Sequence, residues 1–239
     1  VLKATFKSLN EADLSLPVRI DMVGSEPAQK QLESQTADVA IVAEKNTGKA
    51  KDYDGYDRYL FAFQPALVIT HQSNPLSEIQ LEVVGKLLNS DGGLRAWGDL
   101  GLRGEWARRD IKLMSLSPAR SMSLPLLVSR AELSPRVLQK DWNYHEEIDS
   151  LIAEVASQRR AIAITGWLPE RMRQGIVILP VSSKMGDKSS ASSYAVRPSI
   201  STIKNDEYPL SFPLVLYVKK ANESKEAFDA GSMMRSMLA

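Results

Sequence analysis

The sequence has no cysteine, only two histidines, and no excess of charge of either sign. Without cysteine, a disulfide framework and thiolate metal sites are excluded. His71 and His145 stand far apart and outside any His-x-x-His spacing, so neither a metal site nor a cofactor is expected. The balance of 30 basic and 29 acidic side chains argues against nucleic-acid binding, because bulk electrostatic binding requires a basic domain or stripe.

Long apolar runs and hydrolase motifs are also missing. No apolar run approaches the roughly 20 residues that cross a bilayer, and Val1 is followed by Lys3 and Lys7 rather than by the apolar core of a signal segment. The chain contains serine, histidine and aspartate, but no Gly-x-Ser-x-Gly turn presents a serine as a nucleophile. We therefore predict no catalytic residues and do not expect an enzyme.

Hydrophobic residues make up 44% of the 239 residues, enough for a sizeable core in one large domain or in two lobes. The N-terminal part predicts a strand at 18–23, a Gly24-Ser25 turn, a helix with Pro27 in its first turn, and an apolar strand at 38–43. Strands that alternate with helices in this way indicate an α/β fold, and the apolar strand is typical of a parallel sheet covered on both faces.

The clearest local pattern lies between Gln64 and Asp110. An apolar strand ends at the Asn74-Pro75 turn, and Ser77 with Gln80 predicts a capping box at the start of a helix. The following segment, residues 97–100, predicts a turn anchored by one large side chain, Trp97. We further expect a polar loop at 44–58, strands at 111–114, 161–165, 176–181 and 213–218, and helices at 144–160 and 228–238.

A further helix is expected after the strand at 111–114, where Ser117 precedes Pro118. Pro125 would remove a hydrogen bond from the interior of such a helix. The helix is therefore either kinked at Pro125 or begins later than Ser117.

Three segments, in the same order, resemble the PstS-like periplasmic phosphate-binding proteins of the type II periplasmic binding protein superfamily. They are the strand at 36–42, the region from Asn74-Pro75 to Trp97-Gly98-Asp99-Leu100, and the segment Tyr208-Pro209-Leu210-Ser211 with the strand that follows it. The resemblance implies a two-lobed α/β fold, each lobe an open, mostly parallel sheet flanked by helices. One lobe would comprise residues 1–75 and 196–239, and the other residues 76–195.

The resemblance also implies a function. Proteins of this kind bind phosphate or a related small oxyanion in the cleft between the lobes and deliver it to an ABC transporter permease. They are periplasmic or otherwise extracytoplasmic, so a signal segment upstream of Val1 would have been removed. Contact with the membrane is then expected only through the transporter or through a removed anchor.

The resemblance places the ligand-binding residues at two predicted helix starts, where backbone amides favour anions. Gly24 and Ser25 match the first, although serine is a preferred N-cap in any helix. The second contains Ser117, Arg120, Ser121 and Ser123, whose hydroxyls and guanidinium are suited to a phosphate group.

The sequence departs from the family pattern at two places. Ala43 and Glu44 occupy the position of a family hydroxyl, and no Gly-Thr pair follows the second helix start. These departures favour an alternative, a PstS-like domain with a degenerate ligand site that acts as a sensor, adhesion or protein-interaction module. Four tryptophans could stack on an aromatic or sugar ligand, or could be packing anchors: Trp97, Trp106, Trp142 and Trp167.

Overall fold

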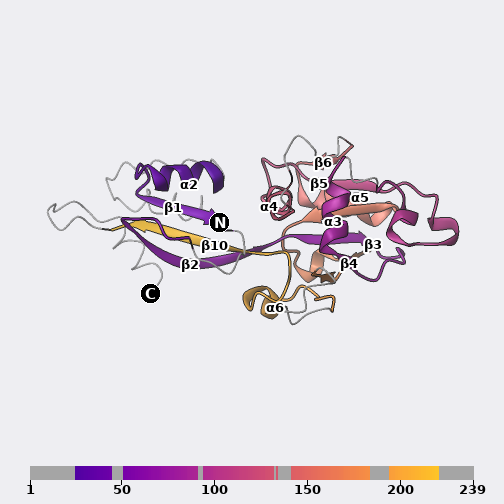
Figure 1. The fold of residues 1–239 in the computed structure, drawn as a ribbon. Helices are drawn as coiled ribbons and strands as arrows, with labels where there is room; N and C mark the ends of the chain where they lie inside the picture. Colours follow the sequence, from indigo (N-terminus) through magenta and orange to yellow (C-terminus); the bar gives the residue numbers. More distant parts are fainter. Residues whose placement is uncertain are drawn as a thin grey trace.

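In the computed structural model of this protein, the described residues form a three-stranded sheet and a five-stranded sheet, each accompanied by helices, and a further two-stranded sheet (Figure 1). The predicted strand at 18–23, Gly24 and the predicted helix at 228–238 lie outside the residues that the structure describes. The described residues are 25–44, 51–90, 94–131, 133, 141–183 and 194–220. Among these residues, no helix combines the length and the apolar character needed to span a membrane.

The smaller sheet has three strands in the order β1 (Val39–Ala43), β10 (Ser211–Lys219) and β2 (Tyr56–Pro65). Helix α2 (Ser25–Glu33) packs against β1, with Pro27 in its first turn as predicted. Its apolar face is formed by Ala28 and Leu32, which are buried in one cluster with side chains of the sheet. This confirms the predicted strand and the predicted core-facing residues of the helix.

The direction of strand pairing in the smaller sheet differs from the prediction. Both described pairs, β1 with β10 and β10 with β2, are antiparallel rather than parallel. An apolar run such as β1 indicates burial on both faces but does not fix the direction of its neighbour. Residues 56–58, expected in a polar loop, instead extend β2, where Asp57 and Arg58 pair with the central strand.

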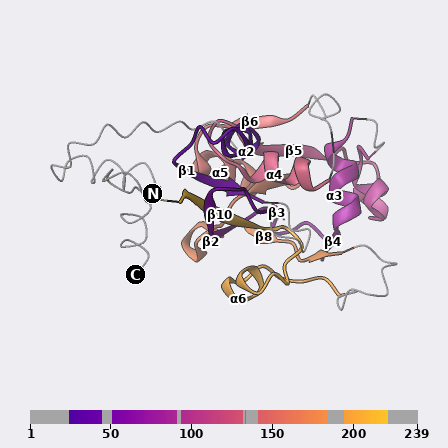
Figure 2. The same cartoon turned by 60° about the vertical axis from the view of Figure 1, so that its left-hand side comes forward.

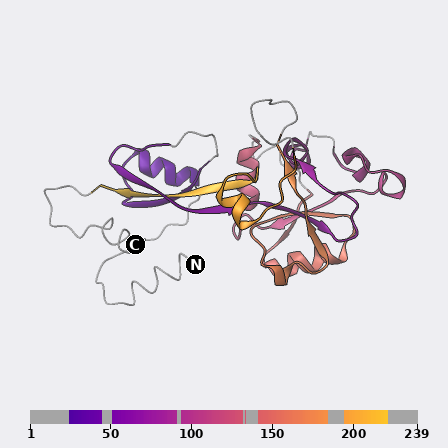
Figure 3. The same ribbon diagram turned by 90° about the horizontal axis from the view of Figure 1, so that it is seen from below.

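The larger sheet has five strands in the order β6 (Asn143–His145), β5 (Lys112–Leu116), β7 (Ala161–Thr165), β3 (Leu67–His71) and β8 (Ile176–Ile178). β5 is parallel to β6 and β7, whereas β3 is antiparallel to β7 and β8. The sheet is therefore mixed, not mostly parallel. Helices α3 (Leu81–Leu88) and α5 (Ile148–Ser157) lie on opposite sides of it (Figure 3).

Two helices begin later than the sequence predicts. Residues 79–80 form the short strand β4, which pairs with β9 (Val181–Ser182), so α3 begins at Leu81 and its N-cap makes no side-chain hydrogen bond. The expected capping box is therefore absent. Similarly, the first residues of the helix expected at 144–160 belong to β6, and only α5 is helical.

The helix after β5 settles the two alternatives for Pro125. Residues 118–120 form a turn, and helix α4 (Ser123–Arg130) begins at Ser123 rather than at Ser117. Pro125 consequently lies in the first turn of α4, where a backbone N–H has no intrahelical acceptor. The later start is confirmed, and the proline costs the helix no internal hydrogen bond.

The chain passes between the sheets at two places that lie side by side (Figure 2). It leaves the smaller sheet after Pro65 and returns to it at Ser211, and the Ala66 amide donates to the Leu210 carbonyl across 2.9 Å. The hydroxyl of the buried Tyr208 also donates to the Ala66 carbonyl, at 3.1 Å. β3, expected in the first lobe, thus lies in the larger sheet, and we propose that the lobes divide at these crossovers. Helix α6 (Ile200–Lys204) lies just before the return crossover.

Candidate functional site

The loop between β5 and α4 brings four of the predicted site residues together. The amides of Arg120 and Ser121 both donate to the Ser117 carbonyl, at 2.8 and 3.1 Å. The Ser121 hydroxyl lies 3.2 Å from the hydroxyl of the fully buried Ser123, and it accepts the Ser123 amide at the same distance. The loop therefore folds its hydroxyls around the start of α4.

The start of α4 has the polarity that an anion requires. Its N-cap, Met122, makes no side-chain hydrogen bond, and the first amide of the helix, that of Ser123, donates to the Ser121 hydroxyl, so the positive end of the helix dipole faces a neutral hydroxyl rather than a carboxylate. The hydroxyls of Ser115 in β5 and Thr165 in β7 are buried and have no hydrogen-bond partner among the described residues. β5 and β7 run parallel, and Gly166, which directly follows Thr165, lies close to Ser123 at the start of α4.

Strand β6 and α5 hold this loop in place. The Ser117 amide donates to the His145 carbonyl across 2.8 Å. The His145 ring is fixed in turn, with Nδ1 2.9 Å from the Ser150 hydroxyl and Nε2 3.1 Å from a Glu154 carboxylate oxygen. His145 is thus a buried structural residue.

Arg120 is oriented by Glu146, which directly follows β6. Its Nε donates to Glu146 Oε2 across 3.0 Å, and both side chains are exposed. Within the described part of the chain, the terminal guanidinium nitrogens of Arg120 have no hydrogen-bond acceptor. This edge of the guanidinium can therefore bind an oxyanion.

Two residues that the sequence did not predict complete this side of the site. Gln64, at the crossover, has Nε2 3.5 Å from the Ser123 hydroxyl and donates to the Pro65 carbonyl at 3.1 Å. Gly166 follows β7, and a Cβ atom there would lie 3.0 Å from Gln64 Nε2 and 3.4 Å from the Ser123 hydroxyl. A glycine directly after a buried strand was the available signal for this close approach.

The other predicted group lies on the smaller sheet. Ser25 is the first residue of α2, and its hydroxyl accepts a hydrogen bond from the Ala43 amide across 3.0 Å, which ties the helix start to the end of β1. Among the described residues, no hydrogen bond or ion pair joins Ser25 to the group between Ser117 and Ser123. Figure 1 shows α2 beside β1 of the smaller sheet and α4 beside the larger sheet.

Glu44, which stands where the resembled family has a hydroxyl, is paired with Arg58 of the smaller sheet. Its side chain is buried, with Oε2 2.8 Å from Arg58 Nη2. The Tyr217 hydroxyl donates to the other carboxylate oxygen and to the Lys51 carbonyl. The hydrogen bond that Arg58 donates to Glu44 raises the pKa of Arg58, and burial, aided by the Glu44 carboxylate, raises the pKa of Tyr217. The carboxylate charge is thus compensated before any ligand arrives.

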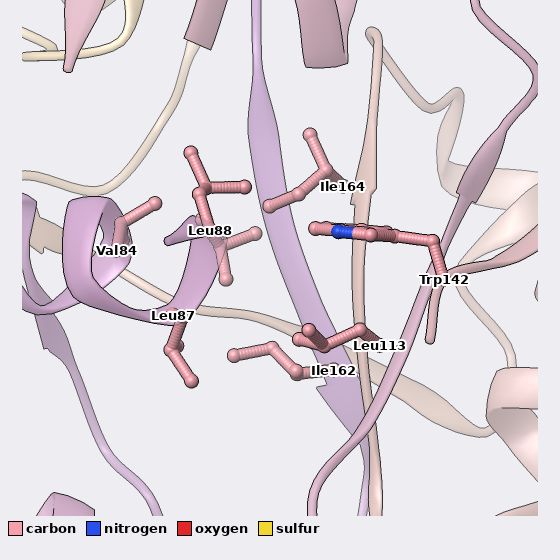
Figure 4. A pocket seen from close by; sticks show the side chains of 8 residues that line it. Val84, Leu87, Leu88, Leu113, Trp142, Ile162 and Ile164 are labelled. Atoms are coloured by element: carbon pink, nitrogen blue, oxygen red, sulfur yellow. The ribbon is translucent and has the colours of Figure 1, made fainter. Parts of the chain in front are cut away.

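Two cavities in the larger sheet and its loops do not include the predicted site residues. One, of about 10 Å³, lies between α3 and the sheet and is wholly apolar, with Trp142 and Ile164 in its wall (Figure 4). The other, of about 240 Å³, is lined by Arg95, Asp110 and Asp141 together with Leu94, Ile111 and Leu113. Neither joins the start of α4 to the smaller sheet.

Comparison with known proteins identifies the family. The sequence profile of the PBP superfamily domain matches residues 5–232. The chain belongs to this superfamily. It is 22% identical over 222 residues to the phosphate-binding protein PstS of Pseudomonas aeruginosa, a match that covers 85% of this chain and 64% of that protein. The chain therefore spans slightly less than two thirds of the length of this relative.

Solved structures agree with this assignment. A possible phosphate-binding protein from Planctomyces limnophilus superimposes with a TM-score of 0.74 at 18% identity, over 91% of this chain and 76% of that one. An ABC-type phosphate transport receptor from Vibrio cholerae gives 0.69 at 14% identity, over 99% and 86%. PstS from Borrelia burgdorferi gives 0.66 at 16% identity, over 100% and 87%. These similarities confirm the type II periplasmic-binding-protein fold.

Proposed function

We propose that this PBP superfamily protein is an extracytoplasmic solute-binding protein that holds phosphate or a related small oxyanion between its sheets for uptake by an ABC transporter. The superfamily and the names of similar proteins support this function. The curated relative is a phosphate-binding protein, and one similar structure is that of a phosphate transport receptor. The role is one of binding, with no chemical step and no cofactor.

The observation that carries the proposal is the group of polar residues at the start of α4. The Ser121 hydroxyl lies beside the buried Ser123 hydroxyl at the start of α4, and the terminal guanidinium nitrogens of Arg120 have no acceptor among the described residues. Several neutral donors can share the charge of a desolvated phosphate, while one arginine supplies bidentate geometry. The arrangement matches the chemistry of a small tetrahedral oxyanion.

Closure between the sheets would complete the site. The Ser25 group lies with the smaller sheet and the α4 group with the larger one, and the crossover segments near Ala66 and Leu210 run between the two sheets. An anion that accepts hydrogen bonds from both groups stabilises the conformation in which they approach each other. Binding energy would therefore be coupled to the change in shape that a transporter can recognise.

Calorimetric titration with phosphate, sulfate and molybdate tests the proposal. We expect binding of at least one of them, and a loss of affinity of about tenfold or more for Arg120→Ala, because a charged hydrogen bond is removed. The matched control is Arg95→Ala. It removes an exposed arginine that pairs with Asp141 away from the proposed site, so its affinity for the anion should be unchanged. Absence of heat with all three anions would reject the proposed ligand class.

A second function is favoured by one specific observation, the internal pairing of Glu44. Ala43 has no hydroxyl, and Arg58 forms an ion pair with Glu44. The smaller sheet therefore provides few hydrogen-bond donors for an anion. A domain of this kind could serve as a sensor, adhesion or protein-interaction module without a small ligand. Crystals grown with phosphate distinguish the two functions, since an ordered anion on Arg120 or Ser121 supports transport and its absence supports the module.

A further inference from the structure

The end of β6 is attached to the candidate anion loop at two points. The His145 carbonyl accepts the Ser117 amide across 2.8 Å. The next residue, Glu146, accepts a hydrogen bond from Arg120 Nε at 3.0 Å. The segment from Ser117 to Arg120 is therefore held at both ends by neighbouring residues of one strand end, and a change of charge at this strand end acts on the residues that would hold the anion.

The His145 ring is enclosed by groups of α5. Nδ1 lies 2.9 Å from the Ser150 hydroxyl, and Nε2 lies 3.1 Å from Glu154 Oε2. The His145 side chain is only 8% exposed and that of Glu154 only 31%, so solvent screens their charges weakly. The Glu154 carboxylate also accepts the Asn143 side-chain amide, at 3.0 and 3.1 Å. This second partner keeps the carboxylate in place when the ring is neutral.

Histidine is the side chain that ordinarily changes charge between pH 5 and 8. The other ionisable side chains on α5, around β6 and in the loop are carboxylates, one arginine and one tyrosine: Glu146, Glu147, Asp149, Glu154, Arg120 and Tyr144. Carboxylates ordinarily titrate below this range and arginine above it. Burial raises the pKa of Tyr144, which keeps its phenol neutral. The residues of β5 that pair with β6, Met114 to Leu116, carry no ionisable side chain.

We propose that protonation of His145 strengthens anion binding at the loop between β5 and α4, so that the protein holds its ligand more tightly as the pH falls from about 8 to about 5.5. This inference rests on the proposed oxyanion site. While His145 is neutral, the Glu154 carboxylate adds a negative charge near the loop that no cation balances. The protonated ring neutralises that charge, and the anion is repelled less.

Calorimetry with inorganic phosphate and with sulfate, at several pH values from about 5.5 to 8, tests the proposal. Inorganic phosphate itself titrates in this range, so the quantity to compare is the ratio of the Kd of His145→Gln to that of the natural protein at each pH. The ligand's own titration cancels in this ratio. We expect the ratio to rise roughly twofold to threefold as the pH falls, because only the natural protein gains a positive charge at this position.

The matched control is His71→Gln, which removes the other histidine of the chain. His71 follows Thr70, which pairs with Ile162 near the start of β7, whereas Gly166 at the candidate site follows the end of that strand. His71 is therefore at the opposite edge of the sheet. The corresponding ratio for His71→Gln should stay constant with pH.

A second variant, Glu154→Gln, separates the charge from a structural role. Glutamine keeps an oxygen acceptor for Asn143 but carries no charge. If the charge matters, Glu154→Gln should bind the anion at about pH 8 roughly twofold to threefold more tightly than the natural protein does, and its affinity should vary less with pH. A residue that only supports the loop would give weaker binding in this variant at every pH.

NMR detects the same coupling directly, since the two histidines give two sets of ring signals that the variants assign. Protonation and anion binding are linked, so saturating anion at about pH 6.5 should move the His145 signals toward those of the protonated ring and leave His71 unchanged. If an anion binds but the His145→Gln ratio is constant with pH, or Glu154→Gln weakens binding, the inference is wrong and the oxyanion site stands. If neither anion binds the natural protein, both proposals fail.

Discussion

The Glu44 carboxylate and the Arg58 guanidinium form an ion pair, 2.8 Å from Oε2 to Nη2, at the end of β1 where the resembled family has a ligand-binding hydroxyl. The pair is shielded from water on the Glu44 side, and Tyr217 donates to the second carboxylate oxygen. A position expected to contact the ligand thus contributes to the structure of the smaller sheet.

The first prediction concerns the stability that this pair contributes. Glu44→Ala should lower the free energy of unfolding by about 2–3 kcal/mol, because it leaves the partly buried Arg58 guanidinium without its carboxylate and removes one of the two acceptors of the Tyr217 hydroxyl. Glu33→Ala removes an exposed partner of Lys51 and should cost less than about 0.5 kcal/mol. Urea unfolding of both variants measures the difference. Equal stabilities would show that the Glu44 pair contributes nothing.

The second prediction is a pH dependence at Asp99. Its carboxylate accepts the amides of Ala96 and Arg95, each across 2.8 Å, and these hydrogen bonds lower the pKa of Asp99. A carboxyl group whose folded pKa lies below its unfolded value contributes stability above the unfolded pKa, near 3.9, and loses it as the pH falls through the folded pKa. Asp99→Ala should therefore cost about 1 kcal/mol near pH 7.

This cost should shrink when the pH falls below about 4, because the natural carboxyl group is then protonated as well. Denaturant unfolding of both proteins at several pH values measures it. Asp99→Asn keeps an oxygen acceptor and should lose less than Asp99→Ala at neutral pH. A difference between natural protein and Asp99→Ala that stays constant at all pH values would contradict the assignment.

The third prediction compares two glycines. A Cβ atom at Gly98 would lie 2.6 Å from the Ala107 carbonyl oxygen, a backbone atom that cannot move aside alone, so Gly98→Ala should destabilise the protein by about 2 kcal/mol. Gly85 lies within α3, and its Cβ position is 3.5 Å from the Ala131 Cβ, an ordinary contact. Gly85→Ala should stabilise by up to about 1 kcal/mol. Thermal unfolding distinguishes the two signs.

Much of the fold could be predicted from local sequence patterns. The strand at β1, the break at Pro65 between β2 and β3, and the buried strand β7 follow from apolar runs and their breakers. The anchor role of Trp97 is confirmed, since it is fully buried and its Nε1 donates to the Arg160 carbonyl at 3.3 Å. These features depend on a few neighbouring residues, which a single sequence contains.

The features that were missed depend on distant partners. The strands of the smaller sheet are antiparallel because both outer strands pair with β10, which comes from far along the chain. Residues 79–80 form a strand rather than the first residues of α3 because they pair with β9. For the candidate site, the sequence predicted the loop before α4 but not Gln64 or Gly166. Their approach to Ser123 arises only when the crossover and the end of β7 meet; the glycine after the buried strand β7 indicates a close approach there but does not identify the partner.

The final prediction tests this meeting point. Gly166→Ala places a methyl group 3.0 Å from Gln64 Nε2, which forces the amide or the nearby Ser123 hydroxyl to shift by a few tenths of an ångström. If both belong to the anion site, affinity for the bound anion should fall roughly fivefold to tenfold, the effect of one weakened hydrogen bond. Stability should change by less than about 1 kcal/mol, because the Gln64 side chain can move. Gly85→Ala, remote from the site, is the control for calorimetry. Unchanged affinity in Gly166→Ala would remove Gln64 and Gly166 from the site and leave only the loop between β5 and α4 as its basis.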